Sequence, residues 1–488
     1  MSALSTPGIS HSVAVSTTKV TSALRSTARS RLRIRRQLSS ARRSAPRVVG
    51  AGGGSCGLTA TGQQSHSLPR TCPSVPRITP ALVRGKHRVA APPGRDTFGL
   101  VRRLLIAVLS VFLFACSPPP ATRAPAKIVG YFTGWGVYGR DFQVKDLDTD
   151  GAAQKLTHIV YAFGKVTGGR CSAADAWADY DKPMPAADSV DNVPDRPTDP
   201  LRGNFGQLRK LKAKHPGLKV IWSFGGWTGS AGFTAAARDP AAFAASCRAL
   251  VGDPRWAGVF DGIDVDWEYP NACGLTCDAG GRDALTRVLS ALRSSFGPDA
   301  LISAAVPADL GKLDRADYLG ASRPADWLSA MTYDYFGTDD QRRTEPHSPL
   351  TTYPGIPRDT ATTSATVDKL LELGIPPAKV LLGIAFYGRG WTGVTGSGPG
   401  SAASGPAAGR FETGLEDYEV LATRCPPTGT AGGTAFARCG DQWWSYDTPR
   451  TIRAKMAYAR SKGLGGAFAW ELSGDTTRSD LLGAIAGG

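Results

Sequence analysis

The sequence has little that would bind a metal ion or cross a membrane. Its six histidines are scattered, and none joins a pair of cysteines at the spacing of a zinc site. The apolar run of residues 104–115 is too short to span a bilayer as a helix. We therefore expect a protein with no metal and no cofactor.

Acidic and large aromatic side chains are almost absent from the N-terminal part. Residues 1–116 hold 18 of the 57 lysines and arginines but one acidic residue, Asp96, and residues 1–97 contain neither tryptophan nor tyrosine. We expect residues 1–100 to be disordered, because they can bury little, or to precede a true translation start near Val101. A basic arm that binds nucleic acid is the alternative. The other residues hold 39 basic and 40 acidic side chains, so the net charge of +16 does not indicate a nucleic-acid partner.

A secretory signal is predicted over residues 101–116. Arg102 and Arg103 precede the apolar run, and Cys116 and a Pro-rich spacer, residues 117–126, follow it. Cleavage near Ala115 fits this pattern. A lipoprotein signal, in which a lipidated Cys116 would anchor the protein to the membrane, also fits. In either case we expect an exported protein, secreted or held at the cell surface.

Six cysteines follow the signal, an even number that suggests disulfides in an exported domain. They are Cys171, Cys247, Cys273, Cys277, Cys425 and Cys439. Closeness in sequence favours the pairs 273–277 and 425–439, which leaves 171–247. Other pairings of six cysteines stay open at this point.

Strand-type and helix-type segments alternate after the spacer. The predicted strands are residues 128–133, 156–163, 219–224, 258–267, 300–306, 327–333, 379–387 and 464–470, and helical periodicity covers 205–214, 240–251, 283–296, 361–373 and 451–462. The strands are nearly continuous apolar runs, typical of parallel strands covered on both faces. Eight βα repeats predict an α/β TIM barrel over residues 127–488. A doubly wound sheet is disfavoured because no Gly-rich phosphate loop follows the first strand.

The connection between the seventh and eighth predicted strands is far longer than ordinary βα connections. We expect its residues 393–450 to form a small α+β subdomain that walls one side of the barrel mouth.

Three carboxylates end the fourth predicted strand. Asp264, Asp266 and Glu268 occupy alternate positions and therefore share one face. Crowded carboxylates on an inward face raise one another's pKa values, which suits Glu268 as a general acid. A metal-binding acidic cluster or a solvated strand end is the alternative, and the apolar residues between the acids disfavour the latter. Asp261 is out of phase and is assigned a structural role.

The pattern D-x-x-D-x-D-x-E of residues 261–268 resembles the signature of glycoside hydrolase family 18, the family of chitinases and their relatives. Residues 219–227, KVIWSFGGW, are similar to its third-strand motif, with Ser223, Gly225 and Gly226 matching S-x-G-G. Residues 331–334 (MTYD), 386–389 (FYGR) and 465–471 (GGAFAWE) resemble its later motifs, in the right order. The insertion resembles the chitinase insertion subdomain, although it is shorter.

The resemblance implies retaining hydrolysis of chitin or chito-oligosaccharides, which are β-1,4-linked polymers of N-acetylglucosamine. Glu268 would protonate the glycosidic oxygen, and the substrate's own acetamido oxygen would attack the anomeric carbon to give an oxazolinium ion. Asp266 would bind the acetamido N–H, and Asp264 would share a proton with Asp266. Tyr333 would hold the acetamido oxygen.

Further substrate contacts follow from the same resemblance. Met331 and Asp334 belong to the sixth-strand motif, Tyr387 and Arg389 to the seventh, and Trp470 resembles the aromatic floor beneath the cleaved sugar, with a core tryptophan as the alternative. Trp135, Trp227, Tyr269 and Trp391 follow strand ends, where they either pack or extend the groove.

Two other functions fit parts of the pattern. A relative that cuts peptidoglycan or N-glycan cores is disfavoured because the insertion deepens the groove and suits a linear polymer. A non-catalytic chitin-binding lectin on the same barrel typically lacks the acid at the position of Glu268. We expect a monomer.

Overall fold

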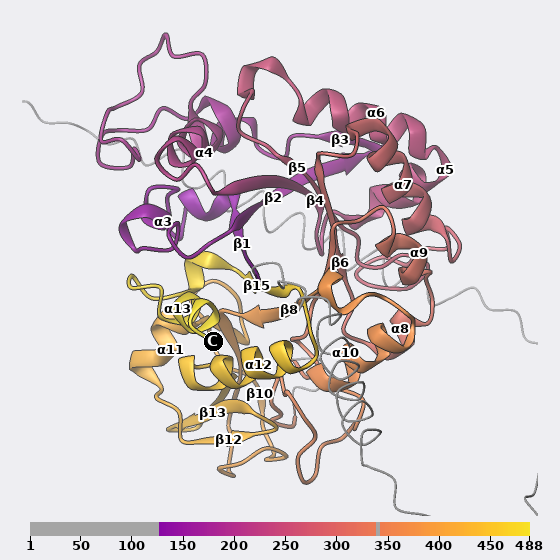
Figure 1. Ribbon diagram of the computed structural model, residues 1–488. Helices are drawn as coiled ribbons and strands as arrows, with labels where there is room; N and C mark the ends of the chain where they lie inside the picture. The colour runs from indigo at the N-terminus through magenta and orange to yellow at the C-terminus, as the bar shows by residue number, and fades with distance from the viewer. Residues whose placement is uncertain (1–125, 338–341) are drawn as a thin grey trace, which may run out of the picture. The chain divides into compact units, whose positions relative to one another are not determined.

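The computed structural model describes residues 126–337 and 342–488 (Figure 1). The predicted N-terminal extension, the signal with Cys116 and nearly all of the spacer lie outside the described residues. Within the described ranges, no helix combines the length and apolar character needed to cross a membrane.

Eight parallel strands close into a TIM barrel, as the sequence predicts. They are β1 (Lys127–Thr133), β2 (His158–Thr167), β4 (Lys219–Gly225), β5 (Gly262–Asp266), β6 (Leu301–Val306), β7 (Trp327–Ala330), β8 (Val380–Ala385) and β15 (Gly466–Trp470). Each strand pairs with the next in this order, and β15 pairs with β1 to close the ring. A short strand, β3 (Arg170–Ser172), pairs antiparallel with the end of β2.

Five longer helices follow the predicted helical periodicity. They are α4 (Gly203–Lys214), α6 (Pro240–Val251), α7 (Ala284–Phe296), α10 (Thr363–Glu372) and α12 (Pro449–Ser461). The Asp239 side chain accepts a hydrogen bond from the Ala242 N–H, and Pro240 occupies the first turn, as expected for the start of α6.

Shorter elements complete the connections. The α-helices are α3 (Asp146–Thr149), α5 (Phe233–Arg238), α8 (Leu310–Leu313), α9 (Tyr318–Ser322), α11 (Tyr418–Arg424) and α13 (Asp480–Ala486). The 3₁₀ turns are η1 (Gly134–Val137), η3 (Ser230–Gly232), η4 (Pro254–Trp256), η5 (Pro377–Lys379) and η6 (Leu472–Gly474), and η2 (Trp177–Asp181) is a π turn.

A second, antiparallel sheet forms the insertion between β8 and β15. It contains β9 (Tyr387–Thr392), β10 (Gly405–Pro406), β11 (Leu415–Asp417), β12 (Gly429–Ala431), β13 (Thr434–Cys439) and β14 (Gln442–Tyr446). The sheet begins at Tyr387, earlier than the predicted start at residue 393. The apolar run of residues 379–387 contains both the end of β8 and the start of β9, so the sequence pattern does not separate them.

Apolar side chains form two layers around the barrel strands. The inner layer includes Val129, Ile221, Leu381 and Phe468, all buried. The outer layer lies between the strands and the helices and holds most of the buried leucines and valines. Burial on both faces explains why the barrel strands read as continuous apolar runs.

Three disulfides brace the described chain. They join Cys171 to Cys247, Cys273 to Cys277 and Cys425 to Cys439, the pairing favoured by the sequence. The first links the β3 segment to α6, and the third links the end of α11 to β13.

Candidate active site

The carboxylate row lies at the carboxyl end of β5, inside the mouth of the barrel. Asp264 and Asp266 are side chains of β5, and Glu268 follows two residues after Asp266. Asp264 is fully buried and Asp266 is 5 % exposed, so both carboxyl groups are removed from bulk water. Such burial favours the neutral form of a carboxyl group.

Hydroxyl groups surround the deepest acid, Asp264. Ser223 and Ser303 are its register neighbours on β4 and β6, and they donate hydrogen bonds of 2.7 and 2.6 Å to its two oxygens. Tyr131 on β1 donates a third of 3.1 Å. Burial raises the pKa of Asp264, and the three hydroxyls oppose that rise. The sequence motif identified Ser223 but missed Ser303 and Tyr131.

The second acid of the row is Asp266. Its Oδ1 is buried and has no hydrogen-bond partner among the described residues. Burial, together with the charges of Glu268 and Asp264, raises the pKa of Asp266 well above its ordinary value. An unpartnered buried acceptor is costly, and an amide N–H that entered the mouth would satisfy it. The proton shared with Asp264 stays a prediction.

The third acid, Glu268, follows the end of β5. Burial raises the pKa of its carboxyl to about 7, although Tyr269 and Lys312 oppose the rise. The Glu268 N–H donates to Ser230 Oγ at 2.9 Å, and that hydroxyl donates to the Gly226 carbonyl at 2.8 Å. A carboxyl group with a pKa near neutrality can give up a proton in one step and accept one in the next.

Close backbone packing explains the glycine pair of the third-strand motif. Gly225 and Gly226 have φ angles of +115° and +81°, which side chains rarely allow. A Cβ at Gly225 would lie 2.1 Å from the Asp266 carbonyl oxygen, and one at Gly226 would lie 2.6 Å from the Phe163 ring. The two glycines therefore let β4 and its loop approach the acid row.

A small loop closed by the Cys273–Cys277 disulfide supports the other side of Glu268. A Cβ at Gly274 would lie 2.3 Å from the Glu268 carbonyl oxygen and 3.3 Å from the Trp227 ring. Leu275 at the tip of this loop is 58 % exposed. Sequence spacing predicted the disulfide, but nothing in it indicated this contact with the acid.

Asp334 and Arg389 bind each other at the edge of the site. The Arg389 guanidinium donates two parallel hydrogen bonds, of 2.9 and 2.8 Å, to the Asp334 carboxylate. Burial alone would raise the pKa of Asp334, but this pairing and His347 hold it well below its ordinary range. Arg389 was expected as a substrate contact; its guanidinium is engaged by Asp334 in this structure.

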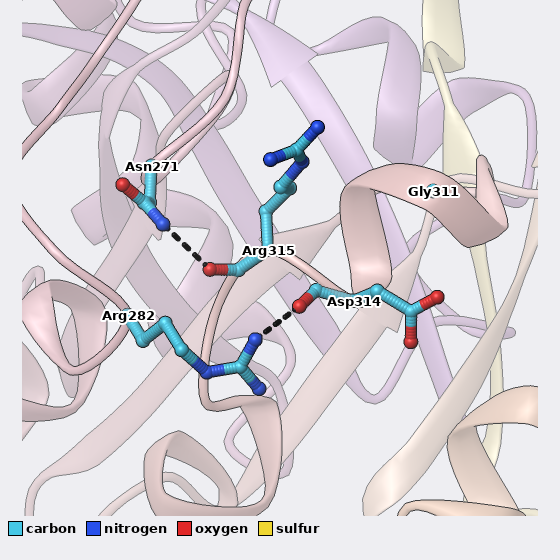
Figure 2. Close-up of a pocket in the computed structure, with 5 residues that line it drawn as sticks. All are labelled: Asn271, Arg282, Gly311, Asp314 and Arg315. Carbon is cyan, nitrogen blue, oxygen red and sulfur yellow. Dashed lines mark hydrogen bonds between the residues drawn. The ribbon is translucent and has the colours of Figure 1, made fainter. Parts of the chain in front are cut away.

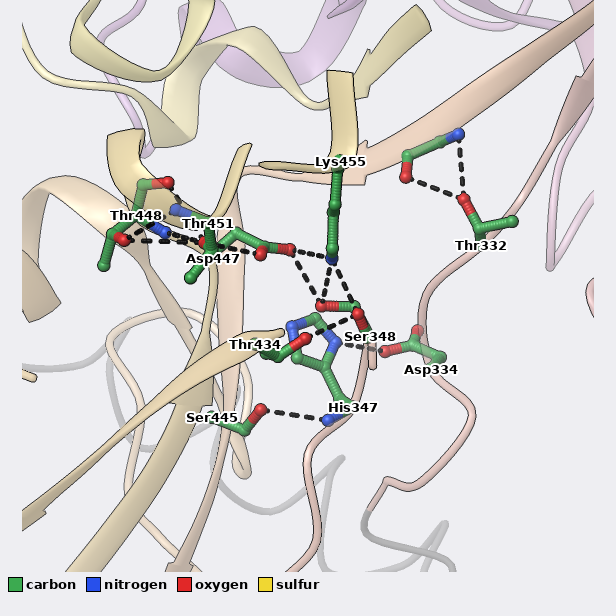
Figure 3. A network of polar contacts seen from close by, with 11 residues as sticks. Thr332, Asp334, His347, Ser348, Thr434, Ser445, Asp447, Thr448, Thr451 and Lys455 are labelled. Atoms are coloured by element: carbon green, nitrogen blue, oxygen red, sulfur yellow. Dashed lines mark hydrogen bonds and ion pairs between the residues drawn. The ribbon is translucent and has the colours of Figure 1, made fainter. Parts of the chain in front are cut away.

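A buried polar network extends behind Asp334 (Figure 3). His347 Nδ1 lies 3.4 Å from Asp334 Oδ1, and the next residue, Ser348, accepts a hydrogen bond of 2.6 Å from Lys455 Nζ at its carbonyl oxygen. Lys455 is fully buried and also pairs with Asp447 at 2.5 Å. The network ties the segment beside Asp334 to α12 and stabilises a charge that would otherwise be unpaired in the interior.

Aromatic rings line the floor of the mouth. Trp470, half-buried at the end of β15, stacks on Phe163 with ring centroids 5.6 Å apart and meets Tyr131 edge-on at 5.4 Å. Tyr333 lies 6.2 Å from Tyr387 in an edge-on contact. Tyr333 and Met331 are partly buried against the inner apolar layer.

The outer aromatic residues divide into exposed and buried groups. Trp135 and Trp227 are 46 % and 51 % exposed, so their rings are available to a ligand. The Lys312 ammonium lies 4.0 Å from the centre of the Tyr269 ring. Trp391 is fully buried beside Trp443 in the second sheet, so it packs in the interior and does not extend the groove.

Asp261 lies before β5, away from the acid row. Its carboxylate binds Lys212 Nζ at 2.7 Å and accepts a hydrogen bond of 2.8 Å from the Val220 N–H. These contacts connect the start of β5 to α4 and β4.

An open pocket of about 460 Å³ lies beside the loop that follows Glu268 (Figure 2). Asn271 donates a hydrogen bond of 2.8 Å to the Arg315 carbonyl, and Arg282 donates to the Asp314 carbonyl. Both bonds join the loop after β5 to the segment after α8, so they hold in place the loop on which Glu268 lies.

The chain is similar to several known proteins. The family model described as "Glycosyl hydrolases family 18" matches residues 127–475. Chitinase C of Streptomyces lividans is 58% identical over 366 residues, which are 74% of this chain and 59% of that protein. Chitinase 63 of Streptomyces plicatus is 56% identical over 376 residues, which are 76% of this chain and 62% of that protein.

A solved structure agrees with the fold. The catalytic domain of psychrophilic chitinase B from Arthrobacter TAD20 superimposes with a TM-score of 0.70 at 36% identity, covering 76% of this chain and 96% of that one. The chain spans about three fifths of the length of the two Streptomyces proteins that it matches.

Proposed function

Because this chain belongs to glycosyl hydrolase family 18, we propose that it hydrolyses chitin and chito-oligosaccharides with retention of configuration. The observation that carries the proposal is the acid row. Glu268, whose carboxyl pKa is about 7, lies next to a buried Asp266 with an unpartnered oxygen, in a mouth floored by Trp470. The names of the relatives support the substrate class.

In the first step, Glu268 transfers its proton to the glycosidic oxygen while the bond from that oxygen to the anomeric carbon breaks. The acetamido oxygen of the same sugar forms a new bond to the anomeric carbon, which gives an oxazolinium ion. The Asp266 carboxylate accepts a hydrogen bond from the acetamido N–H and stabilises the positive charge. Tyr333 holds the acetamido oxygen.

In the second step, a water molecule attacks the anomeric carbon and gives a proton to Glu268. The ring of the oxazolinium ion opens, the acetamido group is restored and Glu268 is again protonated. Two displacements at one carbon retain its configuration. The acid is present at position 268, so the lectin alternative is not favoured.

The site acts outside the cell in this proposal. Three disulfides support an oxidising environment, in agreement with the predicted export signal. The proposal leaves two forms of export open, release after cleavage near Ala115 and anchoring through a lipidated Cys116, which mass spectrometry of the mature N-terminus distinguishes. It also includes a monomeric state, which light scattering tests.

The pH profile and the acetamido requirement test this function together. We expect kcat/KM on the N-acetylglucosamine hexamer to fall as the pH rises above about 7, because Glu268 must be protonated in the free enzyme to act as the acid. The matched control is the glucosamine hexamer, which lacks the attacking acetamido oxygen and should not be cleaved. Undiminished turnover well into the alkaline range, or cleavage of the control, would contradict the mechanism.

A further inference from the structure

A partly buried arginine connects the insertion to the barrel beside the aromatic floor. Arg140 follows η1 in the connection after β1, and its side chain is 15% exposed. Its Nη1 lies 2.5 Å from Asp417 Oδ2, and its Nε lies 3.3 Å from Glu471 Oε1. The guanidinium also covers the Phe411 ring at 4.4 Å. One side chain thus joins three distant segments of the chain.

Glu471, the first of the two carboxylates that pair with Arg140, directly follows Trp470 in the sequence. Glu471 is 8 % exposed and accepts hydrogen bonds from Thr133 Oγ1 at 3.1 Å and Ser473 Oγ at 2.7 Å. Burial raises its pKa, and Arg140 opposes that rise. The Trp470 carbonyl accepts a hydrogen bond of 2.8 Å from the Phe386 N–H. The backbone on both sides of the Trp470 ring is therefore fixed.

The second carboxylate belongs to the insertion. Asp417 on β11 is 3 % exposed and is the register partner of Tyr387 on β9. Tyr387 in turn contacts Tyr333, which is proposed to hold the acetamido oxygen. Arg140 therefore acts on the strand pair that carries Tyr387 as well as on the segment that carries Trp470.

The ion pairs between the insertion and the Trp470 segment depend on the positive charge of Arg140. Two nearly buried carboxylates share the Arg140 guanidinium, and removing one partner of a buried pair leaves a charge without compensation. Arg410 also lowers the pKa of Asp417, but its side chain is 53% exposed and its ion pair, at 3.8 Å, is with Glu419. In the described part of the chain, no ion pair joins Arg410 to Glu471 or to Asp417, whereas Arg140 pairs with both.

We propose that Arg140 is a positioning residue for the hydrolysis of oligosaccharides. It holds the insertion and the Trp470 segment in a single arrangement at the mouth of the barrel, and so it sets the affinity for the sugar chain. This inference rests on the proposed function and adds a residue that touches neither the substrate nor the acid row.

Kinetics of Arg140→Gln in the full chain test the proposal. We expect KM for the N-acetylglucosamine hexamer to rise about tenfold or more, with a smaller change in kcat, because ground-state binding is lost while the acid row is intact. Arg140→Lys keeps the charge and should recover part of the affinity. Arg410→Gln is the matched control on the exposed side of Phe411 and should leave KM unchanged. A purely structural arginine would lower Tm and leave KM unchanged well below Tm, which would overturn the proposal.

A binding measurement separates this proposal from the proposed function. Hexamer affinity is measured by calorimetry on Glu268→Gln, alone and combined with Arg140→Gln, and we expect about tenfold weaker binding by the double variant. If Arg140→Gln does not fold, the variant that combines Arg140→Gln with Asp417→Asn is used in its place. It removes one of the two carboxylates that would otherwise be left without a positive partner. Equal affinities would overturn the role of Arg140 even if wild type cleaves the hexamer. Weaker binding by the double variant, together with an inactive wild type, would support Arg140 and contradict the proposed function.

Discussion

Glu268→Gln is expected to lower kcat on N-acetylglucosamine oligomers by about 10² to 10⁴-fold, the contribution of a positioned general acid. The amide has nearly the same shape as the carboxylic acid but cannot transfer a proton to the glycosidic oxygen. It also cannot take the proton of the attacking water. Because the side chain keeps its size, KM should change little and Tm should not fall.

Product release from the hexamer, followed by chromatography, measures this effect. Glu372→Gln is a matched control, since Glu372 lies exposed on α10 on the outside of the barrel. Its kcat should equal that of wild type. A Glu268→Gln variant that retains more than about a tenth of wild-type kcat would exclude Glu268 as the proton donor, because a general acid contributes far more than that.

Asp266→Asn is expected to lower activity and raise stability. We expect kcat to fall by about 10² to 10³-fold, because the amide cannot stabilise the positive charge that develops on the acetamido group. At neutral pH we expect Tm to rise. The carboxylate that is removed is buried, has an oxygen without a partner and lies beside two other acids.

The gain in Tm of Asp266→Asn should increase as the pH rises. The pKa of Asp266 is raised in the folded protein, so the folded state holds its proton more tightly than the unfolded chain does. Its contribution to stability is therefore present below the unfolded pKa of about 4 and is lost as the pH rises towards the folded pKa. The Tm of Asp266→Asn minus that of wild type should grow over this range.

Calorimetric melting curves at several pH values measure the difference. Asp299→Asn, a change on an exposed connection between α7 and β6, is the control and should shift Tm little at any pH. A lower Tm for Asp266→Asn at neutral pH would mean that the carboxylate is stabilised by contacts absent from this structure.

The barrel and the acid row could be predicted because both follow from local periodicity. Strands buried on two faces read as unbroken apolar runs, and alternation along β5 places Asp264 and Asp266 on one face whatever surrounds them. Glycines 225 and 226 were found only as part of a motif. Glycine is needed at these positions because the Asp266 carbonyl and the Phe163 ring lie close to them, and those contacts come from neighbouring segments.

Contacts between distant segments could not be predicted from these patterns. Arg389 was expected as a substrate contact, and the sequence did not show that Asp334 also binds its guanidinium. Lys455 was part of a helical pattern that contains several charged residues, and only the fold buries it against Asp447. Which charged side chain is buried depends on how helices and loops pack, and neither composition nor spacing records this.

The second sheet begins before the predicted insertion for a related reason. Apolar and aromatic residues continue from β8 through Phe386 into β9, so no break in the pattern marks the change from one sheet to the other. Trp391 was ambiguous because a tryptophan after a strand end has the same local sequence whether it packs or binds. Its burial beside Trp443 is a property of the second sheet.

The measurement that tests the central claim most directly is the anomeric configuration of the first products. Proton NMR during early hydrolysis of the N-acetylglucosamine hexamer distinguishes the β-anomer from the α-anomer before mutarotation equilibrates them. The substrate-assisted mechanism, with Glu268 as the acid and no enzymatic nucleophile, predicts that the new reducing ends appear first as the β-anomer. Initial release of the α-anomer would mean direct attack by water with inversion and would contradict the account.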